Sequence, residues 1–106
     1  MNIDALRKLL AKGQDNAMLR FGLGKALLDS GDADEASEQL RACVNHDPDY
    51  SAAWKLLGKA EQQRGDTEAA RRAWASALDS ASRKGDKQTE REVQVFLNKL
   101  DKAAKS

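Results

Sequence analysis

Cysteine, histidine and proline each occur once in this chain of 106 residues, and each scarcity excludes a class of structure. The single cysteine, Cys43, cannot form a disulfide within the chain, and it fits a reducing compartment such as the cytoplasm. The one histidine, His46, has no cysteine at a metal-binding spacing, so we expect no metal and no other cofactor. Apolar runs are too short for a transmembrane helix, and the first residues lack the pattern of a signal peptide.

The chain also lacks an excess of charge of either sign. The 18 lysines and arginines are interleaved with 17 aspartates and glutamates, for a formal net charge of +1. This balance argues against a nucleic-acid or anionic-membrane surface, since both need concentrated basic charge. Catalysis has equally little support, because the lone histidine completes no Ser-His-Asp set and Cys43 falls at a small-residue packing position. Strand-like alternation is absent too, so we expect one all-α domain.

Glycine followed closely by aspartate occurs at four places, each at the end of a stretch with helical periodicity. Gly13, Gly31, Gly65 and Gly85 each follow a periodic stretch and precede an aspartate by one or two residues. Glycine tolerates the left-handed conformation that ends a helix, and the aspartate accepts hydrogen bonds from the next helix's free N–H groups. Pro48 ends a further helix just before it. The sequence thus predicts six helices, at residues 3–12, 16–30, 33–46, 50–64, 67–83 and 87–102.

A repeat with a spacing of 34 residues is the strongest signal in the sequence. Residues 23–26, Leu-Gly-Lys-Ala, return unchanged as residues 57–60. Self-similarity at this period predicts a stack of helical hairpins, none of which buries its apolar face alone. Gly24 and Gly58 fall inside helices, where glycine costs about 1 kcal/mol relative to alanine. We therefore expect each glycine to allow close approach of a partner helix, and leucine at either position to be strongly destabilising.

These residues make the chain resemble the tetratricopeptide repeat family, whose unit reads Trp-x₂-Leu-Gly-x₂-Tyr, then Ala-x₃-Phe, then Pro. The matching positions are Leu23, Gly24, Ala36, Leu40 and Pro48 in a first unit, and Trp54, Leu57, Gly58, Ala70 and Trp74 in a second. The chain departs from the pattern at Arg20, Leu27, Glu61 and Ser82. Because the second unit lacks its proline, its second helix should run on towards Lys84.

The resemblance implies a right-handed α-solenoid of antiparallel helix hairpins. In this interpretation residues 1–14 form a covering helix, 15–48 and 49–84 form two repeats, and 85–106 form a second covering helix. Covering helices are expected because an open end of a solenoid would expose apolar surface.

The resemblance also implies where a ligand would lie. Ligands of this family usually occupy the concave groove, lined by four positions on the first helix of each unit. That register, continued on the last helix, gives the predicted peptide-binding residues Met18, Phe21, Lys25, Leu28, Lys55, Lys59, Gln62, Arg91 and Gln94, with Ala52 and Asn98 beside them. Two other interpretations stay open: the lysines form an ordinary solvated face, and Met18 and Phe21 pack against the first helix.

We therefore expect a non-catalytic module that binds a protein or peptide with apolar and acidic groups, as a monomer or weak homodimer. The alternative is a structural module that self-associates through Trp74, Phe96 or the apolar seam of the first helix. Direct RNA binding is a third possibility, which the near-neutral charge disfavours. The Lys-Asn clamp by which some family members hold the carboxylate of chaperone tails is missing, because Phe21 and Lys25 stand at its first two positions.

Overall fold

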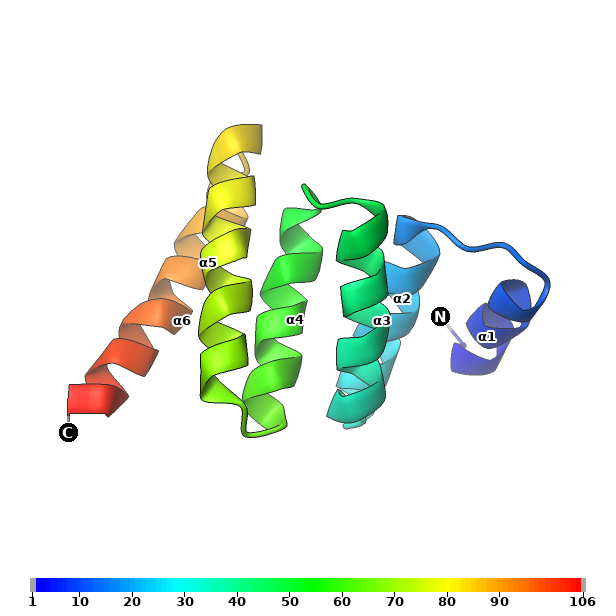
Figure 1. Ribbon diagram of the computed structural model, residues 1–106, viewed down its shortest axis with the longest axis horizontal. Coiled ribbons are helices and arrows are strands. Elements are labelled where there is room, and N and C mark those ends of the chain that lie inside the picture. The colour runs from blue at the N-terminus through cyan, green and yellow to red at the C-terminus, as the bar shows by residue number, and fades with distance from the viewer. Residues whose placement is uncertain (1, 106) are drawn as a thin grey trace.

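Residues 2–105 are described by the computed structural model, and they form six α-helices and no strand (Figure 1). The helices are α1 (Ile3–Ala11), α2 (Ala17–Asp29), α3 (Ala33–His46), α4 (Ser51–Gln63), α5 (Thr67–Lys84) and α6 (Lys87–Lys105). The all-α prediction is confirmed, and only α6 departs from its predicted bounds by more than one residue. Met1 and Ser106, the outer ends of the two predicted covering units, lie outside the described residues.

Aspartate side chains start three of the helices, as the sequence predicts. The prediction is wrong for Asp15, because α2 is capped by Asn16, whose side chain accepts from Leu19 N at 2.8 Å. The Asp32 carboxylate accepts from the backbone N–H of the third residue after it at 3.2 Å, and Asp66 does the same at 3.0 Å. Asp86 caps α6 by accepting from Thr89 N at 3.2 Å. Each carboxylate satisfies an N–H group that has no partner within its helix.

The helices end where glycine or proline requires it. The four glycines of the predicted turns all have positive φ angles, between 73° and 90°, a region that other residues rarely adopt. α3 ends at His46, and Asp47 has an extended backbone just before Pro48. α5 continues to Lys84 before a left-handed Gly85, as expected from the missing proline.

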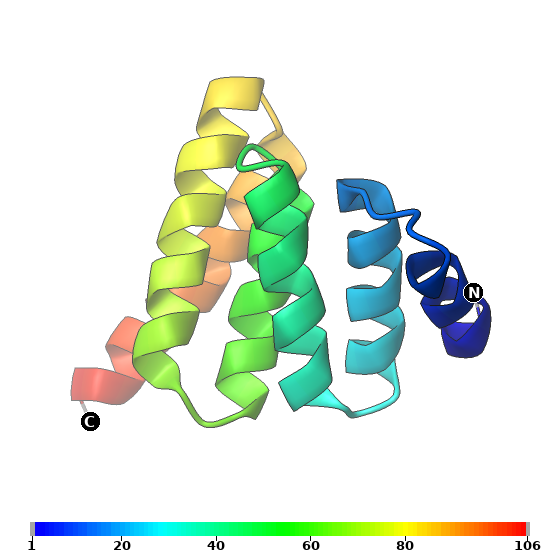
Figure 2. The same cartoon turned by 45° about the vertical axis from the view of Figure 1, so that its right-hand side comes forward.

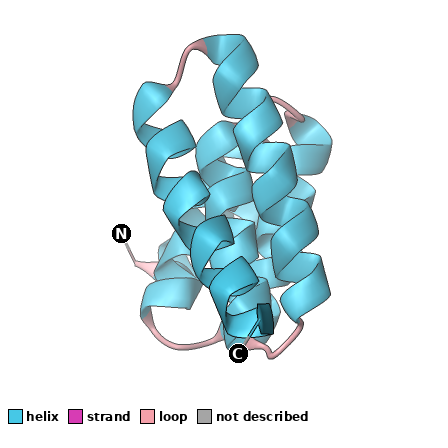
Figure 3. Ribbon diagram, turned by 90° about the vertical axis from the view of Figure 1, so that its left-hand side faces the viewer, coloured by secondary structure: helices cyan, strands magenta, loops and turns pink. Residues whose placement is uncertain are grey.

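From α2 to α6 the helices alternate in direction and pack against their neighbours along a body of 47 × 29 × 19 Å (Figures 1 and 2). Short loops make the connections (Figure 3). α4 touches both α2 and α6 in addition to α3 and α5, so α2, α4 and α6 share a side of the molecule. α1 packs against α2 through the buried Leu6, and α6 packs against α5 through Val93 at the other end.

The core forms two clusters of buried side chains. The larger gathers residues of α1 to α5, including Leu23, Leu40 and Leu57, and the smaller joins α5 to α6 through Trp74 and Val93. Partly buried Trp54 packs against both clusters. Trp74 is only 1% exposed, which excludes it as the self-association contact that the sequence suggested. On α6, Phe96, Leu97 and Leu100 pack against the smaller cluster.

Both helix glycines lie at close helix contacts, as predicted. A β-carbon on Gly24 would fall 2.6 Å from Leu40 Cγ of α3, and one on Gly58 would fall 2.2 Å from Trp74 Nε1 of α5. The two hairpins α2–α3 and α4–α5 are therefore closed at equivalent positions by a glycine that faces a large side chain. No larger residue fits there without displacing its partner.

Candidate functional site

The predicted binding residues lie on three helices that are neighbours in space, α2, α4 and α6. On α2, Met18 has 77% of its surface exposed and Lys25 is exposed as well. The prediction that Leu28 lines the groove needs correction, because its side chain is 9% exposed and belongs to the core. Periodicity placed Leu28 off the apolar face of α2, but that helix is buried on more than one side because α1, α3 and α4 all contact it.

Phe21 links α2 to the start of α4. Its ring stacks on that of Tyr50, with 4.8 Å between centroids and an 18° angle between planes. Offset stacking of this kind adds about 0.5–1.5 kcal/mol to the burial of the two rings. Tyr50 precedes α4 and matches no groove position of the repeat, so the sequence pattern does not indicate it. Phe21 is partly buried, whereas Met18 has most of its surface in solvent.

The two lysines of α4 are held by α6. Lys55 Nζ forms an ion pair with Glu92 Oε1 at 3.1 Å, and only 19% of its side chain is exposed. Lys59 Nζ lies 5.0 Å from the centroid of the Phe96 ring, a cation–π distance. The simple picture of a solvated lysine face is therefore wrong for Lys55 and Lys59. Lys25, in contrast, pairs only with Asp29 one turn further along its own helix, at 3.2 Å.

The remaining predicted residues are at the surface. Gln62, Arg91 and Gln94 are exposed, and Gln94 Nε2 donates to Asn98 Oδ1 at 3.1 Å. Ala52 is half-buried. Within residues 2–105, the guanidinium of Arg91 has no ion pair or hydrogen bond. We name the surface made by Met18, Phe21, Lys25, Lys59, Gln62, Arg91 and Gln94 the α2/α4/α6 face.

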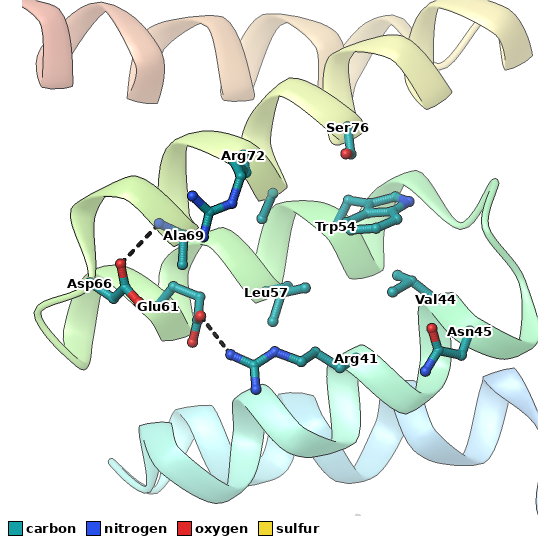
Figure 4. A pocket seen from close by; sticks show the side chains of 11 residues that line it. Arg41, Val44, Asn45, Trp54, Leu57, Glu61, Asp66, Ala69, Arg72 and Ser76 are labelled. Atoms are coloured by element: carbon teal, nitrogen blue, oxygen red, sulfur yellow. Dashed lines mark hydrogen bonds and ion pairs between the residues drawn. The ribbon is translucent and has the colours of Figure 1, made fainter.

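A hollow of about 360 Å³ lies on another side of the molecule, between α3, α4 and α5 (Figure 4). No sequence pattern predicts this hollow, because the hollow depends on how three helices pack. Its lining comes from α3 (Arg41, Val44, Asn45), α4 (Trp54, Leu57, Glu61) and the start of α5 (Asp66, Ala69, Arg72, Ala73, Ser76). We name it the α3/α5 hollow. The signal that could have indicated it is the small side chains of α5 at helical spacing, Ala69, Ala73 and Ser76.

Glu61, at the floor of the hollow, is a buried carboxylate held by two arginines. Its side chain is 3% exposed; Oε2 accepts from Arg41 at 2.7 Å and Oε1 accepts from Arg64 at 2.7 Å. Arg64 also pairs with Asp34 at 2.9 Å. Glu61 stands where the family pattern has tyrosine, and here it joins α4 to α3 by charge. A carboxylate at this depth is tolerated because both its oxygens are bonded to guanidinium groups.

Two further titratable side chains, Asp15 and Cys43, have shifted pKa values. Arg20 and His46 both bond to the Asp15 carboxylate, and the Arg20 guanidinium lowers the pKa of Asp15 to about 2. Burial raises the pKa of the Cys43 thiol to about 11, as fits a thiol with 0% exposure. In the part of the chain that the structure describes, histidine, cysteine and carboxylate side chains form no metal-binding group, and no helix could cross a membrane.

Comparison with known proteins agrees with this architecture. A family model described as tetratricopeptide repeat matches residues 3–42 and 21–86. A TPR repeat-containing protein of Pseudomonas aeruginosa is 60% identical over 103 residues, which cover 97% of this chain and 98% of that protein. A solution structure of a protein from Bordetella parapertussis shares 45% identity and superposes with a TM-score of 0.84, covering 97% of this chain and 90% of that one. With its 34-residue repeat, its stacked hairpins and these relatives, the chain belongs to the tetratricopeptide repeat family.

Proposed function

We propose that this protein is a non-catalytic interaction module whose α2/α4/α6 face binds a protein segment carrying apolar and acidic residues. Tetratricopeptide repeats generally mediate protein–protein interaction, which supports the broad class of function. The observation that carries the finer proposal is Met18, a large apolar side chain with 77% of its surface in solvent. It belongs to neither core cluster, and it lies on α2, the first helix of the face.

The apolar part of the face is at α2. Met18, Phe21 and Lys25 are three and four residues apart, so they lie on the same side of the helix. Methionine has a flexible, polarisable side chain that adapts to varied apolar partners. Phe21, fixed by its stacking on Tyr50, supplies a rigid ring next to it. Together they would anchor one apolar side chain of the bound segment.

The charged part of the face is at α4 and α6. Lys59 has no carboxylate partner within the described residues, and Arg91 has none either. Acidic groups of the bound segment would pair with these two cations and would set its direction along the face. Such rim charges affect the association rate and specificity more than the affinity itself. Lys55 is left out of this role, since it is already paired with Glu92.

The same proposal places the protein in the cytoplasm and assigns it no cofactor and no nucleic-acid partner. The free thiol of Cys43 suits a reducing compartment, and the interleaved charges give no broad basic patch. The competing function is self-association. Its remaining sequence-predicted contacts are Phe96, which is partly buried against α5, and the seam of α1.

The test is affinity capture from a lysate of the organism that encodes the chain, quantified by mass spectrometry. The wild type is compared with a Lys59→Glu, Arg91→Glu variant and with a Met18→Asp variant. A Lys8→Glu, Lys84→Glu variant makes the same charge change at exposed lysines outside the face. Circular dichroism confirms that all variants fold.

We expect a partner that the wild type and the control retain and that both face variants lose. Equal capture by all four proteins would contradict the α2/α4/α6 face as the binding site. Capture of the chain alone, with a mass that rises with concentration in sedimentation, would favour self-association over binding a different protein.

A further inference from the structure

The α3/α5 hollow opens away from the α2/α4/α6 face. Its contribution from α4 is Trp54, Leu57 and Glu61, which repeat at a spacing of three and four residues. Lys59 and Gln62 of the α2/α4/α6 face, which are three residues apart, form a second row on the same helix. At 3.6 residues per turn these two rows lie on different sides of α4. A molecule in the hollow therefore leaves the α2/α4/α6 face free.

The hollow has an apolar end and a charged end. In Figure 4, Val44 and Trp54 lie at one end, with Asn45 and Ser76 beside them, and Leu57 lies in the middle. The guanidinium groups of Arg41 and Arg72 lie towards the other end. The small side chains of α5 leave the space between them open. A volume of about 360 Å³ is within the range of about 300–1,000 Å³ that is typical of ligand pockets.

Of the two carboxylates in the lining, Glu61 is engaged through both oxygens and Asp66 through one. Glu61 is bonded to Arg41 and Arg64, and the Asp66 carboxylate accepts from the backbone N–H of Ala69 at the start of α5. Arg72 is exposed, and its side chain has no hydrogen bond or ion pair within residues 2–105. Arg41 keeps free donors as well, since its side chain is 50% exposed and a guanidinium carries five N–H groups.

We propose that the α3/α5 hollow is a second binding site, for a protein segment with a carboxylate a few residues from an apolar side chain. The carboxylate binds between Arg41 and Arg72, because arginine matches a carboxylate with paired N–H donors. The apolar side chain lies against Trp54 and Leu57. A basic segment would be repelled by Arg72 and would find both oxygens of Glu61 bonded to arginines, which leaves Asp66 as the acidic side chain of the lining that could pair with it.

The site is independent of the proposed function, because none of its residues belongs to the α2/α4/α6 face. A module with two faces of this kind would hold two protein segments at once, one on each side of α4. This arrangement would make the chain a connector between partners.

The experiment is selection from a phage-displayed library of random heptapeptides against the immobilised full chain. Enriched peptides are synthesised, and their Kd is measured by fluorescence anisotropy for the wild type and for two hollow variants. Arg72→Glu reverses the unpaired charge, and Ala69→Leu fills the hollow without changing charge. Lys84→Glu is the matched control, because it makes the same charge change on the same helix about 18 Å away. Circular dichroism verifies the fold of each variant.

We expect peptides with an aspartate or glutamate near an apolar residue, and a Kd that rises at least about tenfold in both hollow variants. Lys84→Glu and Lys59→Glu should leave the Kd within about twofold. Amide shifts of Ala69 and Ala73 in NMR spectra should move when the peptide is added. The proposal is overturned if no peptide is enriched, if enriched peptides lack an acidic residue, or if Arg72→Glu binds them equally well. It is also overturned if only Lys59→Glu weakens binding, a result that would support the α2/α4/α6 face instead.

Discussion

The indole of Trp74 lies directly against the backbone of Gly58, where a β-carbon would fall 2.2 Å from Trp74 Nε1. The ring cannot move aside, because it is 1% exposed and its Nε1 donates to the backbone oxygen of Lys55 at 3.0 Å. A tryptophan in place of the family's phenylalanine is thus accommodated because the facing residue, Gly58, has no side chain.

The first prediction follows from this contact. Gly58→Ala should lower the free energy of unfolding by about 2 kcal/mol or more, although alanine is the better helix former by about 1 kcal/mol. Urea denaturation measures the change. Gly24→Ala is the matched comparison and should cost less, because it meets the aliphatic side chain of Leu40 instead of a hydrogen-bonded ring. A Gly58→Ala protein as stable as the wild type would refute the importance of the contact.

The second prediction concerns the carboxylate beneath the hollow. Replacing Arg41 and Arg64 together with alanine should cost about 3–5 kcal/mol, because Glu61 would stay buried without a partner. Adding Glu61→Gln to that double variant should recover part of the loss, since the buried charge is removed with its partners. Thermal unfolding of the single, double and triple variants gives the comparison. No recovery in the triple variant would mean that the arginines act through packing and not through charge.

The third prediction concerns acid stability. Hydrogen bonding to Arg20 lowers the pKa of Asp15 to about 2, from its ordinary value of 3.8. A group whose pKa is lower in the folded state stabilises the fold above its unfolded pKa, and this contribution disappears as the pH falls through the folded pKa. The difference in urea midpoint between wild type and Asp15→Asn should therefore shrink between about pH 4 and pH 2. A difference that stays constant over this range would argue against the pair.

The fourth prediction concerns the thiol. Cys43 is 0% exposed and its pKa is raised to about 11, so it is both inaccessible and protonated at neutral pH. Alkylation by iodoacetamide at pH 8 should be at least about a hundredfold slower in the native protein than in concentrated guanidinium chloride. Mass spectrometry follows the reaction. Comparable rates in both conditions would show that α3 opens readily.

Local chemistry explains how much of this fold could be predicted from the sequence. Asp32, Asp66 and the turn glycines act within a few residues of their own position, so a capping or turn pattern indicates them reliably. Gly24 and Gly58 were equally informative, because a glycine inside a helix has few reasons to be there other than a close contact. The 34-residue repeat then gave the order of the hairpins.

The candidate sites depend on contacts between helices, and no local sequence pattern predicts these contacts. Leu28 looked like a groove residue until a second neighbour of α2 buried it. The pairing of Lys55 with Glu92 joins residues 37 positions apart, and no periodic pattern records it. The α3/α5 hollow needs three helices to be packed before it exists, so Arg41 and Arg72 gave no signal on their own.

The division of the core into two clusters that meet at Trp54 has a consequence for the way the molecule opens. Contacts run mainly between adjacent helices, so the free energy of unfolding is distributed along the stack and is not shared evenly. α6 rests on a small cluster at one end, whereas α3 and α4 are covered on both sides. Amide hydrogens should accordingly exchange in a gradient, fastest in the end helices and slowest beside Leu40 and Leu57. The centre of the chain thus keeps its shape while its ends can loosen and adapt.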